Sequence, residues 1–349
     1  MIKKEIINKI LKNKKSISIE QYIKICLYGN NGYYKNANVI GKKGDYITAP
    51  EISQLFGDLI GLFIFSVWKN KINNPYNLIE LGPGKGTLLI DILNITKNFS
   101  KFQKSTYVNL IETNVNLIDE QKKNIQNFKF SNKKIIWLDD FNTKITKPAI
   151  IFANEFFDCL PIRQFYRKNN KWFEKMINFN QQNKNFFFED KETSHKKLSN
   201  YVENNDEINN LEISKSRDKY FNKICKHLRI VGGMAIIVDY GYFNKPNYLT
   251  LQSLYNNKRS NVLDNPGKQD ITSLVDFKQL IKITKKNKLN VDIFCNQNKF
   301  LLMNGIKERA KKIYKKSTIN QKHAIKNGLE RLIDKDGMGS LFKVLVISK

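Results

Sequence analysis

The stretch NLIELGPGKGTLLIDIL, residues 77–93, joins a short apolar run, a glycine loop and an apolar run with helical spacing. It predicts a strand that ends near Glu80, a loop that contains Gly82, Gly84 and Gly86, and a helix that starts directly after the loop. Glycines at such a junction let backbone N–H groups approach a ligand at the helix N-terminus. The stretch therefore indicates a nucleotide-type site in an α/β protein.

Two details of the loop distinguish it from the dinucleotide fingerprint. The glycines of this loop, Gly82, Gly84 and Gly86, are spaced GxGxG, whereas the fingerprint is GxGxxG. An acidic residue, Glu80, also stands at the strand end, where it would repel a pyrophosphate and attract a cationic amino-acid group. NAD and a plain glycine-rich turn remain as alternatives at this point.

Acidic residues also end the next two apolar runs. Glu112 closes YVNLIET, where a carboxylate can accept hydrogen bonds from two ribose hydroxyls. With Glu80, it favours S-adenosylmethionine, whose adenosine has free hydroxyls and whose other end carries a cationic sulfur and an α-amino group. Asp139 and Asp140 close KKIIWLDD and either contact the adenine amino group or form a solvated turn.

Short apolar runs alternate with helical patterns along most of the chain, which predicts a parallel, doubly wound sheet buried on both faces. Besides the run that leads into the glycine loop, six such runs are expected to be strands, at residues 107–113, 133–140, 148–158, 232–241, 289–295 and 341–348.

The fourth run, PAIIFA, leads into the segment NEFFDCLP, residues 154–161. Ligands of open α/β sheets lie beyond the carboxyl ends of the strands, so this segment is expected at the reaction site. Its two carboxylates, Glu155 and Asp158, suit a guanidinium or ammonium substrate, which they can orient and deprotonate. The alternative is structural, because Asn154 or Asp158 could simply cap a helix.

The composition has one unusual feature, a net charge of +28 that comes from 60 lysines and arginines against 32 acidic residues in 349 residues. Aromatic residues make up 12%, which excludes a disordered chain. The positive charge is mostly lysine and is spread along the whole chain. We interpret it mainly as compositional, with a dedicated polyanion site as the alternative.

A few features of the sequence predict the cellular compartment of the protein and whether it binds a metal. The longest apolar stretch, Leu59–Trp68, is too short to span a membrane, and the first residues carry neither a secretory signal nor a clear transit peptide. The four cysteines are far apart and the three histidines lack metal-ligand spacing, so no metal is expected. A reducing compartment is predicted, the cytoplasm, or the mitochondrial matrix if the source is eukaryotic.

Several segments together resemble one family, the MidA-type S-adenosylmethionine-dependent methyltransferases. They follow one another in the family's order over nearly the whole chain, and the segments GDYITAPEISQLFG and ANEFFDCLP are the most specific. The segments are residues 40–68, 78–93, 150–165, 232–241, 265–277, 298–310 and 338–348. The resemblance implies a methyltransferase that modifies an arginine of a protein substrate, because mitochondrial members are complex I assembly factors that methylate arginine.

The resemblance also implies roles for individual residues. Residues of the segment Gly44–Ser53 and its neighbour Gln54 would line the cofactor mouth, with Gln54 on the substrate side. Other residues would lie at the substrate opening or in a cap over it. The implied set is Thr48, Pro50 and Glu51 at the cofactor, Asp239 and Tyr240 at the opening, and Gly267, Asp270 and Thr272 in the cap. The catalytic residues are expected in the segment NEFFDCLP, as Asn154, Glu155 and Asp158.

The expected fold is a class I methyltransferase of the Rossmann-like, doubly wound α/β type, with seven strands of which the last is antiparallel. Residues 1–75 are expected to form a helical segment at the cofactor mouth. Two insertions, residues 161–211 and 243–290, are expected to form a substrate-side cap. The core would then comprise residues 76–160, 212–242 and 291–349.

Two other functions are compatible with these features. A non-catalytic complex I assembly factor could bind S-adenosylmethionine only for structure, although such a protein would not need the carboxylates of NEFFD. A nucleic-acid methyltransferase would explain the positive charge, but it would place an amide-bearing motif after the fourth strand to hold a flipped base, whereas here Asn154 is followed by Glu155. We therefore expect no specific nucleic-acid partner, and the oligomeric state stays open.

Overall fold

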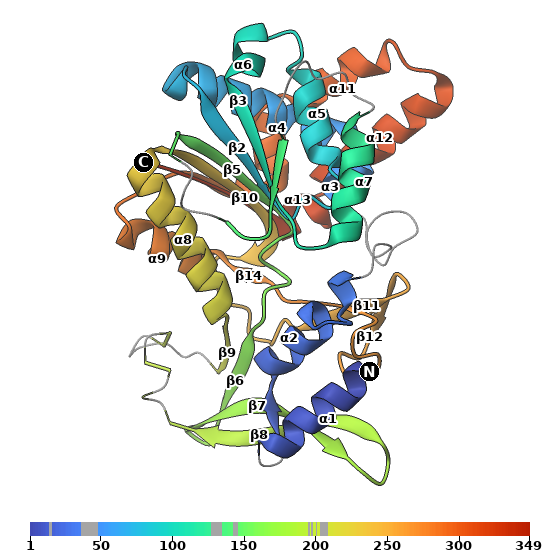
Figure 1. Cartoon of the computed structure of the whole chain (residues 1–349), viewed down its shortest axis with the longest axis vertical. Coiled ribbons are helices and arrows are strands. Elements are labelled where there is room, and N and C mark those ends of the chain that lie inside the picture. Colours follow the sequence, from blue (N-terminus) through green and yellow to red (C-terminus); the bar gives the residue numbers. More distant parts are fainter. Residues whose placement is uncertain are drawn as a thin grey trace. The chain divides into compact units, whose positions relative to one another are not determined.

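A computed structural model describes most of the chain: residues 1–13, 16–35, 48–126, 135–141, 146–194, 196, 198–199, 201–202 and 209–349. The chain divides into two compact units, each built from three segments. The first comprises residues 1–46, 158–220 and 244–274, and the second comprises residues 47–157, 221–243 and 275–349. Figure 1 shows the elements of both units.

The second unit is built on a mixed sheet that is mostly parallel. Its strands follow the order β15-β16-β10-β5-β2-β3-β4, and β14 pairs with β10. From β10 to β4 all neighbours are parallel, whereas β16 is antiparallel to both β10 and β15. The bounds are β2 Tyr76–Leu81, β3 Thr106–Ile111, β4 Ile135–Leu138, β5 Ala149–Asn154, β10 Gly233–Tyr242, β14 Val275–Asp276, β15 Asn290–Asn296 and β16 Phe342–Ser348.

Helices cover both faces of this sheet (Figure 1), which explains why the central strands are apolar on both sides. On one side lie α4 and α5, with α7 beside them, and on the other lies α9. The bounds are α3 Ala49–Ile52, α4 Gln54–Val67, η3 Trp68–Ile72, α5 Thr87–Ile95, α6 Ser100–Ser105, α7 Val115–Gln126, α9 Phe277–Lys286, α10 Gln297–Met303, α11 Ile306–Tyr314, α12 Ile319–Ile333 and α13 Met338–Leu341.

Close packing of α4 on α5 depends on two glycines of α4. A Cβ atom at Gly57 would lie 2.4 Å from Cβ of Asp91, and one at Gly61 would lie 2.5 Å from a methyl group of Ile95. Both distances are shorter than any real contact, so only glycine allows the two helices to approach this closely. The result is that the Asp91 side chain is buried between them.

The first unit is built on antiparallel strands. One sheet has the order β1-β7-β6-β9, with β8 paired to β7, and a second has the order β12-β11-β13. Its apolar core includes Phe165 and Trp172. The bounds are α1 Ile2–Lys12, β1 Ile17–Ser18, α2 Ile19–Tyr28, η1 Tyr33–Lys35, β6 Arg163–Lys168, β7 Lys171–Asn180, β8 Asn185–Thr193, β9 Asn210–Ile213, β11 Gln252–Tyr255, β12 Lys258–Ser260 and β13 Asp270–Thr272, while α8 Lys215–Val231 runs from this unit into the second.

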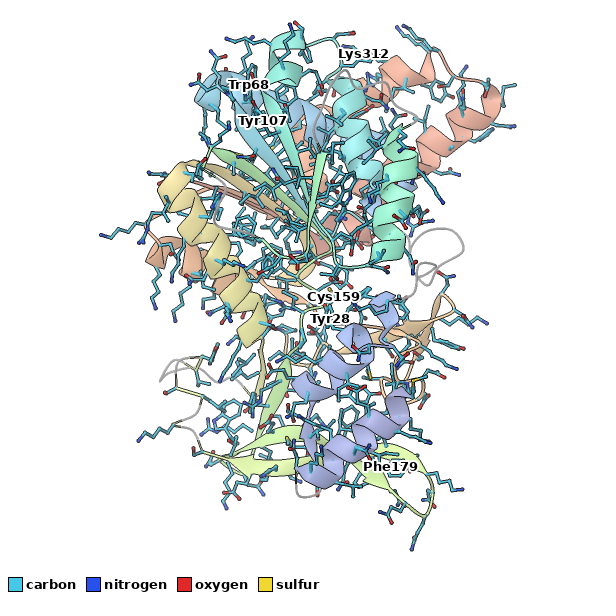
Figure 2. All side chains as sticks on the ribbon, viewed as in Figure 1. Tyr28, Trp68, Tyr107, Cys159, Phe179 and Lys312 are labelled. Carbon is cyan, nitrogen blue, oxygen red and sulfur yellow. The ribbon has the colours of Figure 1, made fainter. Side chains whose placement is uncertain are left out.

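Helix α2 is fixed at both ends within the first unit. Ser18 and Gln21 form a capping box at its start. At its end, the hydroxyl of Tyr28 donates to the backbone oxygen of Cys159 at 3.1 Å, and the two side chains lie side by side in Figure 2.

The sequence prediction of a mixed α/β protein with a mostly parallel sheet is confirmed. Some boundaries differ from the expectation. The predicted N-terminal segment 1–75 is divided between the two units, and residues 275–290, expected in an insertion, pair or pack with the sheet of the second unit. Helices α3 and α4 are separated at Ser53, whose side chain caps α4 by accepting a hydrogen bond from the Leu55 N–H.

No helix in the described part of the chain is long and apolar enough to cross a membrane.

Candidate functional site

The glycine loop between β2 and α5 adopts a backbone that only glycine tolerates well. Gly82, Gly84 and Gly86 have φ angles of 62°, 55° and 78°. A Cβ atom at Gly82 would also lie 3.1 Å from the ring of Phe156, in the turn after β5. The loop follows the carboxyl end of β2, and this edge of a parallel sheet is where α/β proteins bind their ligands.

Side chains of α7 hold the loop from the neighbouring crossover. The amide of Gln121 donates to the backbone oxygen of Gly84 at 2.7 Å, and its oxygen accepts from the indole N–H of Trp137 at 2.8 Å. Asn124 donates to the backbone oxygen of Lys85 at 3.0 Å. These bonds fix the loop in advance, which lowers the entropic cost of binding a ligand. Reading the sequence did not single out these residues, because amides in a polar helix give no signal.

Glu80 is the last residue but one of strand β2, two positions before Gly82, and is only 6% exposed. Its Oε2 is buried and has no hydrogen-bond partner among the described residues. Burial raises the pKa of Glu80 to about 8, and the negative charge of Asp91 adds to this effect. A buried carboxylate without a cation is costly, so the position fits a site that a cationic ligand group completes.

Two further buried acids, Asp91 of α5 and Asp58 of α4, continue from Glu80 into the helices that cover the sheet. Burial, and then the charge of Asp58, raise the pKa of Asp91 to about 8. Asp58 is fully buried, and Arg309 of α11 donates to its Oδ2 from Nε at 2.8 Å. Glu80, Asp91 and Asp58 form a row of buried carboxyl groups with one cation at its far end. Asp58 and Asp91 stand among apolar residues in the sequence, and this pattern could have identified them as buried acids.

Glu112 lies at the end of β3, next to β2 in the sheet. Its Oε1 accepts hydrogen bonds from the N–H groups of Thr113 and Asn114, both at 2.8 Å. These bonds orient the carboxylate at the carboxyl end of the sheet, the position predicted for a ribose-binding acid. Asp139 follows β4 and is exposed, whereas its neighbour Asp140 forms an ion pair with Lys223 at 2.6 Å.

Glu155 has the most unusual backbone of the predicted site residues. Its φ angle is 51°, a left-handed conformation that is uncommon for a residue other than glycine. Its Oε1 accepts hydrogen bonds from the backbone N–H of Ala49 at 3.3 Å and from the amide of Asn154 at 3.0 Å. Strain of this kind persists where the surroundings over-determine a conformation, and it is found most often at functional sites.

The turn that carries Glu155 is anchored to β10 by two bonds. The N–H of Glu155 donates to the backbone oxygen of Val238 at 3.0 Å, and the N–H of Phe157 donates to Oδ2 of Asp239 at 2.9 Å. Asp239 is fully buried and also accepts from the N–H of Tyr240 at 2.9 Å. Its carboxylate therefore positions the backbone around Glu155, a function that the sequence did not indicate.

The predicted residues of the segment 44–53 are described from Thr48 onward, and Gly44 lies outside the described residues. Thr48 precedes α3, and Pro50 occupies its first turn, buried. Glu51 is half-buried. Burial raises the pKa of Glu51, which the charge of Lys85 opposes and the charge of Glu120 increases. These interactions place Glu51 in the electrostatic range of the glycine loop.

The remaining predicted residues divide between the units. Gln54 is exposed at the start of α4, and the ring of Tyr240 packs against Phe342 in the second unit. In the first unit, Asp158 is 5% exposed and its Oδ1 accepts from the Cys159 N–H at 2.7 Å. In the same unit, Asp270 accepts from the hydroxyl of Tyr34 at 2.9 Å. Gly267 lies before β13, and Thr272 is the last residue of β13.

Among the described residues no group of three or more His, Cys, Asp or Glu side chains could hold a metal ion.

Comparison with known proteins finds a matching family model and several relatives. The model of the S-adenosyl-L-methionine-dependent methyltransferase family Methyltransf_28 matches residues 59–295. A Caenorhabditis elegans protein named protein arginine methyltransferase NDUFAF7 homolog, mitochondrial, is 31% identical over 89% of this chain and 78% of its own. The human protein arginine methyltransferase NDUFAF7, mitochondrial, is 26% identical over 97% of this chain and 81% of its own.

A solved structure shares the fold. A crystal structure of a Burkholderia thailandensis protein bound to S-adenosyl-homocysteine matches with a TM-score of 0.87 and 21% identity, covering 100% of this chain and 92% of that one.

Proposed function

Because the chain belongs to the family of S-adenosyl-L-methionine-dependent methyltransferases, we propose that it methylates an arginine side chain of a protein substrate. The observation that carries the proposal is the pair of acidic positions on one sheet: buried Glu80 under the glycine loop and strained Glu155 after β5. Both are suited to cations, the first to the cofactor and the second to a guanidinium. The arginine methyltransferase names of the relatives support the same acceptor.

The residues around the glycine loop fit S-adenosylmethionine. Glu80 would hold the cationic amino-acid end, because its buried Oε2 has no partner among the described residues. Gly82, Gly84 and Gly86 would let backbone N–H groups approach the ligand, and Glu112 would bind the ribose hydroxyls. When bound, the cofactor would supply a methyl group bonded to a positively charged sulfur.

Glu155 would act on the acceptor. A guanidinium stays protonated in proteins, so a carboxylate must stabilise it and take the proton released as the new N–C bond forms. The bonds from Ala49 and Asn154 to Oε1 hold the carboxylate in one orientation. Asp239 holds the turn that carries it. Much of the rate would come from this positioning. The catalytic role of Asp158 stays a prediction.

Complex I assembly and a mitochondrial or cytoplasmic location are part of the proposal. The relatives are mitochondrial by name, so a protein of respiratory complex I is the first substrate to test. A strained carboxylate at the end of β5 favours an enzyme over a purely structural assembly factor. Titration with S-adenosylhomocysteine should give binding of one molecule per chain, and the absence of binding would overturn the proposal.

Affinity for the cofactor should depend on pH through Glu80. The pKa of Glu80 in the protein alone is about 8, and a cationic ligand favours the ionised carboxylate. Below that value, binding must therefore release a proton. The dissociation constant of S-adenosylmethionine should fall about tenfold per pH unit as the pH rises from 6 toward 8, then level off. Isothermal titration in buffers of different ionisation enthalpy measures the proton release.

Two variants separate this effect from other titrating groups, including the amino group of the cofactor. Glu80→Gln cannot ionise and should lose the dependence. Asp91→Asn removes a neighbouring negative charge, so the pKa of Glu80 should fall and the midpoint should move to lower pH. If Glu80→Gln retains the full pH dependence, the carboxylate is not the group that binds the cation.

A further inference from the structure

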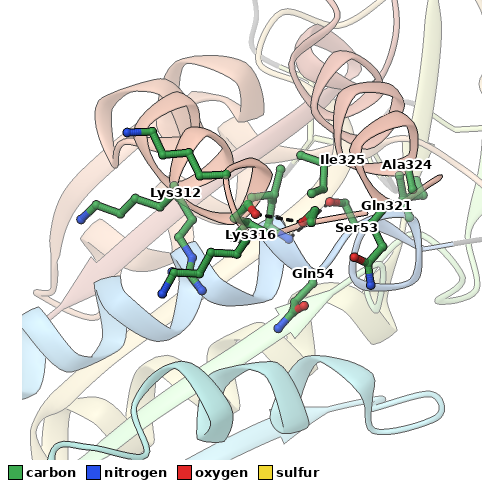
Figure 3. A pocket seen from close by; sticks show the side chains of 13 residues that line it. Ser53, Gln54, Lys312, Lys316, Gln321, Ala324 and Ile325 are labelled. Atoms are coloured by element: carbon green, nitrogen blue, oxygen red, sulfur yellow. Dashed lines mark hydrogen bonds between the residues drawn. The ribbon is translucent and has the colours of Figure 1, made fainter. Parts of the chain in front are cut away.

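A cavity of about 780 Å3 lies in the second unit, and no residue of the glycine loop lines it. Its walls are the end of α3 and the start of α4 on one side and helices α11 and α12 on the other (Figure 3). Its size is within the range of ligand sites in proteins. Gln54, predicted from the family resemblance to lie on the substrate side, is one of its lining residues.

Positive charge dominates the polar part of this cavity. Lys312, Lys315 and Lys316 line it from the end of α11 and the turn that follows, and all three are exposed. Within the described part of the chain none of the three forms an ion pair. Arg309 also lines the cavity, but its guanidinium is bound to buried Asp58 at 2.8 Å. The three lysines are therefore available to an anionic partner.

The uncharged part of the lining combines aliphatic side chains with four polar ones, Ser53, Gln54, Ser317 and Gln321. Ile52 and Leu55 contribute one wall, and Ile313, Ala324 and Ile325 contribute the other. None of the lining residues is aromatic, and the one arginine is already paired. Single-stranded nucleic acids are usually held by aromatic stacking together with cationic groups, so this lining favours another kind of polyanion. An acidic peptide with aliphatic side chains matches both the lysines and the aliphatic side chains of this lining.

The cavity adjoins the proposed reaction site through α3. This helix is a single turn, Ala49–Ile52. At its start the N–H of Ala49 donates to Oε1 of Glu155, and at its end Ile52 lines the cavity. A substrate segment bound in the cavity would therefore be held beside α3, the helix whose first residue orients Glu155.

We propose that this cavity docks an acidic, aliphatic segment of the protein substrate, and that the three lysines provide the attraction. The inference rests on the proposed function for the identity of the partner, but binding itself needs no methyl transfer. Exposed lysines on flexible stems suit several spread carboxylates better than one phosphate, which is normally held by more rigid donors. Binding should weaken as salt rises.

The test uses the full chain and a fluorescein-labelled peptide in which glutamates alternate with leucines, followed by fluorescence anisotropy. The variant K312E/K315E/K316E should bind the peptide at least about tenfold more weakly than the unaltered chain. A matched variant, K278E/K282E/K285E, replaces three exposed lysines of α9 in the same unit. It changes the net charge of the chain by the same amount. It should change the affinity less than about twofold.

Further measurements distinguish an acidic peptide from other molecules that could bind in the cavity. The peptide with glutamine in place of glutamate should bind weakly to the unaltered chain, and K312Q/K315Q/K316Q should lose part of the affinity without charge reversal. Equal losses in the two glutamate triple variants, or none in either, would overturn the proposal. Tighter binding of single-stranded DNA than of the acidic peptide, dependent on the same lysines, would also overturn it.

Cofactor titration keeps this inference separate from the proposed function. All triple variants should bind S-adenosylhomocysteine as the unaltered chain does, because the lysines lie outside the glycine loop. If the chain methylates an arginine but its affinity for the peptide does not depend on the three lysines, only the docking inference fails. If peptide binding depends on them but no methyl transfer occurs, only the proposed function fails.

Discussion

Replacement of Glu155 by glutamine should lower kcat for methyl transfer about a thousandfold and leave cofactor affinity unchanged. Glutamine keeps an oxygen that can accept from Ala49 and Asn154, so the turn after β5 should stay in place. It cannot accept the proton of a guanidinium, and general-base catalysis commonly contributes 10²–10⁴-fold. Single-turnover kinetics with saturating S-adenosylmethionine measure the effect.

A surface carboxylate provides the control for this variant. Glu330 of α12 is exposed, so Glu330→Gln should leave kcat unchanged. Thermal unfolding of Glu155→Gln should match that of the unaltered chain. If kcat falls less than about threefold, Glu155 is not the proton acceptor and the reaction site must be placed elsewhere.

Replacement of Glu112 by alanine should weaken S-adenosylhomocysteine binding about a hundredfold. Each hydrogen bond to a charged acceptor is worth about 1.5–3 kcal/mol, and the carboxylate is predicted to accept from two ribose hydroxyls. Calorimetric titration measures the change. Because Oε1 of Glu112 also accepts from Thr113 and Asn114, the Glu112→Gln variant, which keeps that acceptor, should show a smaller loss.

A deoxyribose analogue of S-adenosylhomocysteine tests the assigned contact. The unaltered chain should bind the analogue weakly, and Glu112→Ala should add little further loss, because the shared interaction is already absent. Asp119→Ala, at an exposed position of α7, serves as the control and should bind the natural ligand normally. Additive losses from the variant and the analogue would contradict the ribose assignment.

Much of the fold could be predicted from local patterns. The apolar runs that lead to Glu80, Glu112 and Asn154 are strands β2, β3 and β5, because runs bounded by turn residues and separated by helices pack as a parallel sheet. Glycines at strand–helix junctions carry the same kind of information, since their positive φ angles belong to the loop itself. These features depend on neighbours in sequence and can be read without a structure.

Other parts of the site depend on contacts between distant residues. Asp239 binds the N–H of Phe157, and Ala49 binds the carboxylate of Glu155, across more than 80 positions in each case. The left-handed backbone of Glu155 lies in the turn that these contacts hold, and a motif of two acids and two aromatics does not reveal it. The division of the chain into two compact units likewise depends on contacts between segments that are far apart in the sequence.

The most direct test of the proposed function is to identify the amino acid that receives the methyl group. The chain is incubated with methyl-labelled S-adenosylmethionine and a protein extract from cells that lack this chain, and the labelled residues are identified by mass spectrometry. The account predicts label on arginine side chains with the unaltered chain and none with Glu155→Gln. Label on lysine or on nucleic acid, or no label from a chain that binds S-adenosylhomocysteine, would contradict it.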